Sequence, residues 1–326
     1  MSNVPRIQPR TVTIGGLLPT DTHAEDLVLP LMTGTTTVSI IMDGLHDAVS
    51  RRTGVAIVGP KGAGKTEALR LAAHEFEAAE RQRQELHDGY RRRRVLRLPS
   101  LVSPRYRDVL VELYKALTGT EMRLRMHGSQ LTDDTLLARL AAQAFDHNYV
   151  AILVDQAEAM SPEALRAFRD LMTVASDLDE RRKGVDGVIA AGVGVLLVGT
   201  PAVRAMINET EERAHRWSRV AELHGVWPED ISAIYRAWFP RFTADIARQG
   251  GDAWWERQLE ALVSHGQIVA MRSITEHARR YWQHLMFKAE GDITRETAPL
   301  DLDLFSYAAS ETLWDRYTAP ISGTGA

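Results

Sequence analysis

The chain has 326 residues, of which 44% are apolar and 25% are charged, and its formal net charge is −4. This ordinary globular composition excludes collagen-like, low-complexity and wholly disordered chains, and the length suggests about two domains or one large domain with an extension. Because the net charge is slightly negative, any contact with nucleic acid must come from a local basic patch. The sequence has no cysteine, which excludes disulfides, thiolate metal sites and cysteine nucleophiles.

Neither a membrane span nor a secretion signal is visible in the sequence. No apolar run reaches the roughly 18 residues that a membrane-spanning helix needs. The first residues, MSNVPRIQPRTVTIGG, contain no apolar signal core. We therefore expect a cytoplasmic protein that contacts no membrane.

The spacing of apolar residues predicts alternating helices and strands after an irregular N-terminal arm at 1–36. Helical spacing is present at 37–52, 108–117 and 132–145, and further helices are expected from Lys65 and after Ser161, which would cap its helix. Short apolar runs predict buried strands at 55–58, 95–98, 149–154 and 193–198, and a weaker fifth strand at 220–226. This alternation predicts an α/β fold, with a parallel sheet that is flanked by helices on both faces.

The strand signals stop after Pro228, so the α/β domain is predicted to span 37–228. Residues 229–288 are rich in Trp, Arg and helix formers and predict a small helical lid, followed by a C-terminal tail at 289–326 with one further helix. The tryptophans of this region are expected in the lid core or in a subunit contact: Trp227, Trp238, Trp254, Trp255 and Trp282. The 11 histidines show no metal-binding spacing.

One motif carries clear chemistry. GPKGAGKT, from Gly59 to Thr66, fits G-x-x-x-x-G-K-[ST] and lies between a predicted strand and a predicted helix. Its glycines let backbone N–H groups surround a phosphate at a helix N-terminus. Lys65 is expected to reach the β- and γ-phosphates of ATP, and the Thr66 hydroxyl to bind Mg²⁺. The predicted nucleotide contacts are Gly59, Pro60, Lys61, Gly62, Ala63, Gly64, Lys65, Thr66 and Glu67.

The other half of a nucleotide site is expected at the ends of neighbouring strands. Asp155 follows the apolar run YVAILV and is predicted to hold Mg²⁺ through water. The long separation between Thr66 and Asp155 leaves room for an inserted strand, as in the additional-strand ATPases. Thr200 ends the fourth predicted strand, where it could bond the attacking water or the γ-phosphate, or be a simple turn residue.

Hydrolysis needs a group that polarises the attacking water. Additional-strand ATPases usually have Glu directly after the Asp, but this chain has Gln156, an amide that can orient water and cannot take its proton. Hydrolysis could therefore be slow in a protein that acts as an ATP-state switch, Glu158 could act from a shifted position, or Gln156 could replace a natural Glu to trap ATP. The first and third interpretations are favoured, because Glu158 is expected to face elsewhere at the start of a loop.

The chain resembles an AAA+ ATPase through GPKGAGKT, ILVDQAE, LLVGTP, the Arg-bearing segment RAHRWSRVAEL and the helical lid. The DQAE run, the VGTPAV segment and the short lid resemble the transposition-regulator branch, the TnsC, TniB and MuB kind, over residues 37–285. The resemblance implies an ATP-dependent protein that forms a ring or filament on duplex DNA. Such a protein would recruit and activate a transposase at target sites, in concert with target-selector proteins.

The resemblance also implies two arginine roles. Arg219 in WSRV matches the position of an arginine finger, which reaches the γ-phosphate held by a neighbouring subunit, with Arg213 and Arg216 as rivals. A surface salt bridge is the alternative for Arg219. Arg272 in HGQIVAMRSITEHARR matches a second nucleotide sensor in the lid.

Members of this branch bind duplex DNA through a positively charged inner surface, with little sequence preference. The candidate DNA contacts are Arg105 and Arg107 in LVSPRYRDV, and Arg123 and Arg125 in EMRLRMHG. The basic run 91–94 could join them or only solvate the start of a strand.

Two other functions stay open: an AAA+ ATPase of another purpose, such as origin licensing, secretion or defence, and a monomeric P-loop kinase or switch. The long separation between Thr66 and Asp155 and the candidate finger Arg219 count against the kinase.

Overall fold

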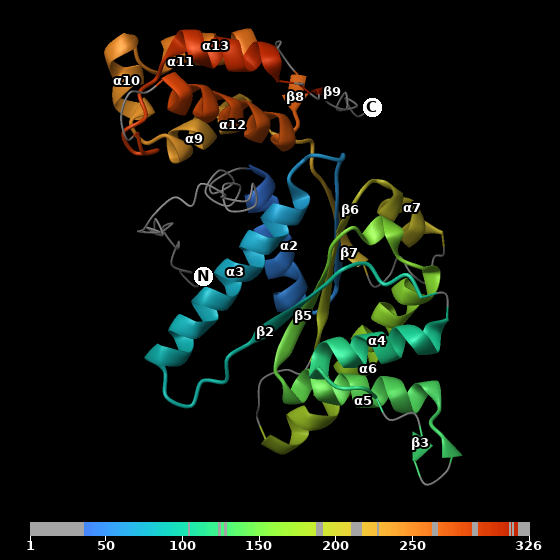
Figure 1. Ribbon diagram of the computed structural model, residues 1–326. Coiled ribbons are helices and arrows are strands. Elements are labelled where there is room, and N and C mark those ends of the chain that lie inside the picture. The colour runs from blue at the N-terminus through green and yellow to red at the C-terminus, as the bar shows by residue number, and fades with distance from the viewer. Residues whose placement is uncertain are drawn as a thin grey trace, which may run out of the picture.

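The computed structural model contains an α/β unit and, at one end of its sheet, a helical unit (Figure 1). It describes residues 36–103, 105–122, 125–126, 129–186, 192–209, 217–226, 228–262, 267–288, 293–312, 314 and 316–318. Most of the predicted N-terminal arm, residues 1–35, lies outside the described residues.

Five parallel strands form the central sheet, in the order β2-β5-β6-β1-β7. Their bounds are β1 (Gly54–Val58), β2 (Arg94–Leu98), β5 (Tyr149–Val154), β6 (Gly194–Gly199) and β7 (Trp217–Glu222). The first four agree with the predicted strands within one residue. β7 begins three residues before the prediction, because it is an edge strand whose first half contains the exposed Ser218 and Arg219 and so lacks an apolar run.

Helices cover both faces of the sheet, as the alternation predicted (Figure 1). On one face lie α2 (Thr36–Arg51) and α3 (Lys65–Leu86), and on the other α4 (Tyr106–Thr118), α5 (Asp133–Asp146) and α6 (Pro162–Asp186). Successive residues of β1 alternate between the two cores, with Val55 and Ile57 in the first and Ala56 and Val58 in the second. The α/β fold class is confirmed.

Shorter elements connect these layers. A hairpin of β3 (Arg125–Met126) and β4 (Ser129–Gln130) lies between α4 and α5, the 3₁₀ helix η1 (Ala157–Ala159) follows β5, and α7 (Ala202–Asn208) follows β6. The predicted cap is present at α6, where the Ser161 hydroxyl accepts from the Ala164 N–H at 3.1 Å.

The helical unit contains α9 (Pro228–Trp238), α10 (Phe242–Gln249), α11 (Asp252–Leu262), α12 (Met271–Lys288) and α13 (Leu302–Glu311), with β8 (Gln267–Val269) paired to β9 (Arg316–Thr318). Trp238 and Trp255 are fully buried, and Trp254 and Trp282 pack against the same core, so these four belong to the lid core, while Trp227 lies outside the described residues. The predicted boundary at 288 differs from the packing, because α13 packs on α12 and buries Phe305 there.

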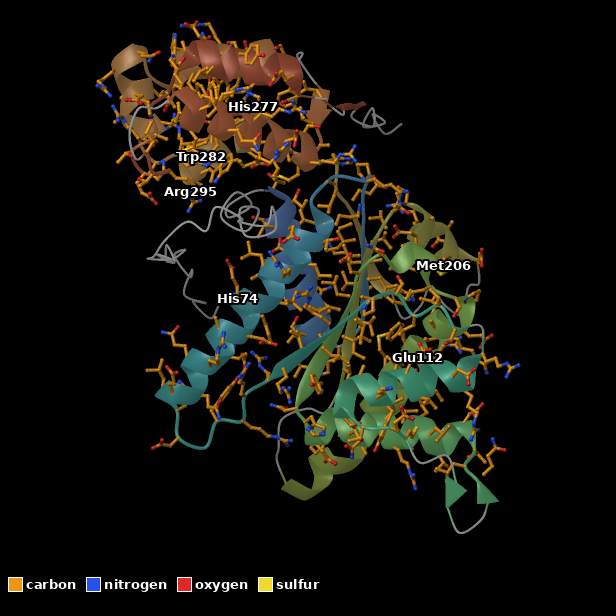
Figure 2. All side chains as sticks on the ribbon, viewed as in Figure 1. His74, Glu112, Met206, His277, Trp282 and Arg295 are labelled. Carbon is orange, nitrogen blue, oxygen red and sulfur yellow. The ribbon has the colours of Figure 1, made fainter. Side chains whose placement is uncertain are left out.

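A buried histidine joins three helices of this unit (Figure 2). The Tyr235 hydroxyl lies 2.5 Å from His277 Nδ1, and His277 Nε2 lies 2.9 Å from the Phe305 carbonyl oxygen. Because that carbonyl only accepts, Nε2 carries the proton and Nδ1 accepts from Tyr235. Burial lowers the pKa of His277 to about 4, so the ring is neutral at pH 7 and α9, α12 and α13 are held together without a buried charge.

Within the described segments, no helix has both the length and the apolar character that crossing a bilayer requires.

Candidate nucleotide-binding site

The loop between β1 and α3 has the backbone of a phosphate cradle. Gly62 and Gly64 have φ of 82° and 80°, a left-handed conformation that favours glycine. A Cβ on Gly59 would lie 2.8 Å from the Cβ of Leu223, so this position also has no room for a side chain. The Ala63 N–H donates to the Pro60 carbonyl at 3.4 Å. The loop therefore turns tightly at the C-terminal edge of the sheet and leads into the N-terminus of α3, a site suited to anions.

The side chain of Lys65, the first residue of α3, reaches back to this loop. Its Nζ donates to the carbonyl oxygens of Gly59 at 2.8 Å and Pro60 at 2.6 Å. Burial lowers the pKa of Lys65, while the charges of Glu158 and Asp155 act in the opposite direction. The structure thus brings one ammonium and two carboxylates, from two separate parts of the sequence, to the same end of the sheet.

Asp155 directly follows β5, and its carboxylate bonds to the backbone of the next residue. Its Oδ1 accepts from the Gln156 N–H at 2.8 Å. Gln156 has φ 51° and ψ 43°, which is left-handed and uncommon for a residue other than glycine. The Ser100 hydroxyl supports this turn by donating to the Asp155 carbonyl at 3.0 Å and to the Gln156 carbonyl. The Gln156 side chain is exposed and makes no hydrogen bond to any described residue.

Glu158, in η1, reaches the end of the neighbouring strand β6. Its Oε2 accepts from the backbone N–H of Thr200 at 3.0 Å. Gly199 makes this approach possible, because a Cβ there would collide with the Glu158 carboxylate. Thr200 is therefore beside the predicted site, but the contact uses its backbone N–H and not its hydroxyl.

The donors expected for Mg²⁺ fit that ion. Mg²⁺ usually keeps several waters and takes one or two carboxylates together with substrate phosphates. Thr66, the second residue of α3, is exposed, and Asp155 is half-buried. No group of three His, Asp or Glu in the described part of the chain could hold a metal by itself. A hydroxyl and a carboxylate beside a phosphate cradle are the donor set that Mg²⁺ accepts with a nucleotide. The nearby Glu67 instead pairs with Arg70 at 2.9 Å.

The lid contacts the loop directly. The backbone N–H of Arg272, at the start of α12, lies 3.4 Å from the carbonyl oxygen of Gly62, and its side chain is exposed. Val226, just after β7, and Val269 exchange hydrogen bonds of 2.9 and 3.3 Å. The predicted second sensor therefore lies next to the predicted phosphate site.

Arg219 lies at the other end of the sheet. It pairs in register with Val55, near the start of β1, whereas the loop follows the end of β1. Its guanidinium contacts Asp47 of α2 at 3.1 Å. Within one chain this is the surface salt bridge that the sequence offered as the alternative to a finger. The rivals Arg213 and Arg216 lie outside the described residues.

A buried carboxylate that the sequence did not single out explains the basic run 91–94. Glu80, on α3, has a side chain with no exposed surface and accepts from Arg83, from the Tyr90 hydroxyl at 2.7 Å and from Arg93 at 2.7 Å. These bonds hold the pKa of Glu80 at about 2, below its usual value, even though burial alone would raise it.

The other arginines of this run are also engaged. Arg91 donates to the Phe145 and Asp146 carbonyls, Arg92 lies 3.4 Å from Glu77, and Arg94 lies 4.7 Å from the centre of the Tyr149 ring. The arginines of the run 91–94 therefore hold the connection before β2 against α3, the end of α5 and Tyr149. These contacts explain the basic run without a DNA contact.

The structure separates the candidate DNA contacts. Arg107 is engaged within the chain, where it pairs with Asp133 at 2.9 Å and donates to the Leu131 carbonyl at 2.7 Å. Arg105 is exposed and has no partner among the described residues. Arg123 lies outside the described residues, and only the backbone of Arg125 is described, in β3.

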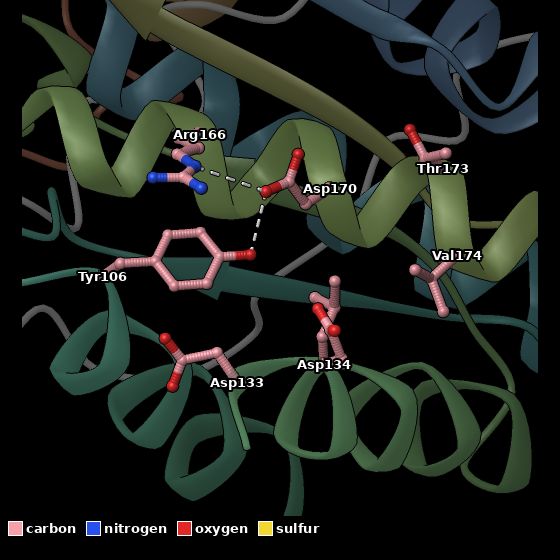
Figure 3. Close-up of a pocket in the computed structure, with 8 residues that line it drawn as sticks. Tyr106, Asp133, Asp134, Arg166, Asp170, Thr173 and Val174 are labelled. Carbon is pink, nitrogen blue, oxygen red and sulfur yellow. Dashed lines mark hydrogen bonds and ion pairs between the residues drawn. The ribbon is translucent and has the colours of Figure 1, made fainter.

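A hollow of about 420 Å³ lies between α4, α5 and α6, away from the nucleotide site (Figure 3). On one side the Tyr106 hydroxyl donates to Asp170 at 2.9 Å, and Arg166 lies over the Tyr106 ring at 4.8 Å. Asp133 and Asp134 of α5 also line it. Because the acidic groups outnumber the basic one, this hollow does not suit the phosphates of a nucleotide.

The comparisons with known proteins agree with this geometry. Residues 47–207 match the family model described as AAA domain. Just under half of the chain is therefore similar to an AAA domain. The matched range contains the glycine loop, Asp155, Glu158 and Thr200, and stops before β7. No curated protein is similar enough in sequence to count as a match.

Solved structures resemble the chain in fold. The ORC2 protein of Aeropyrum pernix in ADPNP–ADP complexes has a TM-score of 0.50 and 16% identity, over 85% of this chain and 66% of that chain. The ADP form of the same protein has a TM-score of 0.47 and 16% identity, over 85% and 67% of the two chains. Cdc6p of Pyrobaculum aerophilum has a TM-score of 0.43 and 16% identity, over 83% and 64%. The chain thus spans about two thirds of the length of these proteins, and the first of them supports the fold.

Proposed function

We propose that the chain binds ATP with Mg²⁺ at the loop 59–66, hydrolyses it, and uses the nucleotide to assemble copies of itself on duplex DNA. Nucleotide binding is supported by one observation above all: Lys65, Asp155 and Glu158 lie near one another beside a glycine loop with left-handed backbone. In this arrangement Lys65 would bind the β- and γ-phosphates, and Thr66 and Asp155 would hold Mg²⁺. When bound, Mg²⁺ neutralises the charge that develops on the phosphates.

The assembly part of the proposal depends on a neighbouring subunit that completes the site. The lid lies against the loop through Arg272 and Gly62, so a bound nucleotide would lie where lid and sheet meet. Arg219 is exposed enough to exchange Asp47 for a partner in another copy, since exposed ion pairs are worth at most about 1 kcal/mol. Arg213 and Arg216 stay candidates for the same role.

Within this function we favour a regulator that recruits and activates a transposase, together with target-selector proteins. The support is the likeness of DQAE and VGTPAV to that branch. An origin-licensing, secretion or defence ATPase is the alternative. A transposase reading frame beside the gene would favour the first, and its absence would favour the others.

Electron microscopy of the full chain tests the assembly directly. With duplex DNA, Mg²⁺ and a non-hydrolysable ATP analogue, we expect rings or helical filaments, and with ADP we expect their loss. A protein that stays monomeric under all these conditions would contradict the assembly. Phosphorylation of a small molecule by the monomer would instead indicate a kinase.

The two described arginine candidates for DNA are expected to behave differently. Arg105→Ala removes an exposed charge that has no described partner, so it is expected to weaken DNA binding several-fold and to reduce the slope of log affinity against log salt by about 1. Arg107→Ala removes the bonds to Asp133 and Leu131, so its main effect is expected on thermal stability. Fluorescence anisotropy with labelled duplex at several salt concentrations measures the slope. An unchanged slope in Arg105→Ala would show that DNA binds at a different surface of the protein.

A further inference from the structure

We propose that Glu158, and not Gln156, is the carboxylate that takes the proton from the attacking water during ATP hydrolysis. This inference rests on the proposed function, because it assigns a catalytic residue at the same nucleotide site. It reverses the preference drawn from the sequence, in which Gln156 implied slow or blocked hydrolysis and Glu158 was expected to face elsewhere.

The first support is the position of the two side chains after β5. Left-handed φ and ψ at Gln156, held by Ser100 and by the Asp155 carboxylate, leave the Gln156 side chain exposed. Two residues later, η1 carries Glu158 back across the sheet edge to the end of β6. The residue next to Asp155 in sequence is therefore not the one that the backbone turns toward the neighbouring strand.

The second support is the position of Glu158 beside the glycine loop. The Gly59 N–H, at the start of the loop, donates to the Gly199 carbonyl at 3.0 Å, and Glu158 accepts from the next residue of that strand end, Thr200. Lys65 begins α3 at the other end of the loop. The Glu158 carboxylate thus lies at the strand end that adjoins the loop expected to hold the phosphates.

The third support is the way in which Glu158 is held. Oε2 accepts from the Thr200 N–H at 3.0 Å, whereas Oε1 accepts no hydrogen bond from any described residue. Gly199 has no side chain, and a Cβ there would occupy the position of the carboxylate. One oxygen is therefore fixed to the scaffold and the other is available to a water, which is the arrangement that a general base needs.

Glu158 Oε1 takes a proton from water as the water oxygen forms a bond to the γ-phosphorus. The bond between that phosphorus and the bridging oxygen breaks, its electron pair stays with the ADP leaving group, and Lys65 stabilises the charge on the phosphates. The proton passes from Glu158 to solvent after phosphate leaves. Gln156 supplies no proton acceptor in this sequence.

The decisive comparison is between Glu158→Gln and Gln156→Ala in the full chain. Glu158→Gln keeps an oxygen that can accept from Thr200 and removes only the capacity to take a proton. We expect its kcat for ATP hydrolysis to fall by about 100-fold or more, while the Kd for Mg·ATP changes by less than about threefold. Gln156→Ala is expected to keep kcat within about threefold of the wild type.

A second variant tests the same carboxylate without replacing it. Gly199→Ala places a Cβ against Glu158, so it is expected to lower kcat at least about tenfold while nucleotide binding and the circular dichroism spectrum stay unchanged. This result would separate a displaced carboxylate from a general loss of fold.

Each outcome decides the proposal. A Glu158→Gln protein that retains more than about one tenth of the wild-type kcat overturns it, as does a Gln156→Ala protein that loses as much as Glu158→Gln. A wild-type protein that binds Mg·ATP but shows no hydrolysis also overturns it and leaves the nucleotide-dependent assembly intact. A wild-type protein that binds no ATP contradicts the proposed function itself, so the two failures are distinguishable.

Discussion

Lys65→Ala is expected to weaken the binding of Mg·ATP by about 100-fold, which corresponds to about 2.7 kcal/mol. The Lys65 ammonium is half-buried at the head of the glycine loop and donates to the carbonyls of Gly59 and Pro60. A bound triphosphate would take the place of these carbonyls as the partner of Nζ. Loss of the Lys65 ammonium would leave the phosphates without the lysine that reaches back to the loop. Charge-assisted hydrogen bonds of this kind are among the stronger hydrogen bonds in proteins. Isothermal titration calorimetry with Mg·ATP measures the change.

The matched control is Lys61→Ala, which removes the same charge from the same loop. Lys61 is exposed, so this variant is expected to bind Mg·ATP within about threefold of the wild type. Because assembly is proposed to depend on nucleotide, Lys65→Ala should also fail to form rings or filaments on DNA, whereas Lys61→Ala should form them. Assembly that survives in Lys65→Ala would show that the interface between copies does not need ATP.

A tight glycine turn between β1 and α3 could be predicted from the sequence because its signal is local. Gly59 to Thr66 lie in one contiguous segment between an apolar strand and a helix, and the left-handed turns at Gly62 and Gly64 need no distant partner. The strands and helices that place Asp155 and Thr200 at the same edge also followed from short apolar runs. Parallel connections then bring the ends of these strands together, whatever the lengths of the loops between them.

The orientation of Glu158 could not be predicted in the same way. It depends on the left-handed backbone of Gln156, a conformation that few residues other than glycine adopt and that Ser100 supports from the connection after β2. It also depends on Gly199, the last residue of β6, whose lack of a side chain leaves room for the Glu158 carboxylate. Each of these contacts joins residues more than 40 positions apart, so the pattern DQAE alone does not contain them.

Two other differences have the same origin. The sequence predicts a separate tail after 288, yet Phe305 and Ala308 complete the core of the lid against α12. The basic run 91–94 looked like a surface patch because arginines are usually exposed. Its main partner, Glu80, is a charged residue of α3, and sequence gives no sign that such a residue is buried.

Glu80→Gln is expected to lower the free energy of unfolding by about 3 kcal/mol at pH 7. The Glu80 side chain has no exposed surface, and its carboxylate accepts hydrogen bonds from Arg83, Tyr90 and Arg93. Its pKa is about 2 in the folded protein against an ordinary 4.5, and this difference sets the size of the effect. Replacing the charge leaves arginines without their buried counter-ion, which is more costly than losing an exposed pair. Urea unfolding followed by circular dichroism gives the value.

The pH dependence of this effect identifies the carboxylate as its source. Because the folded pKa lies below the unfolded one, the stabilisation by Glu80 is complete above the unfolded value of 4.5 and is lost as the pH falls toward 2. The difference between wild type and Glu80→Gln should therefore be constant from pH 6 to 7.5 and smaller by about 1 kcal/mol at pH 4. Glu77→Gln is the control on the same helix, since Glu77 is partly exposed and lies 3.4 Å from Arg92, and it should cost less than about 1 kcal/mol. An equal loss in both variants, or a difference that grows as the pH falls, would show that Glu80 does not hold this cluster through its charge.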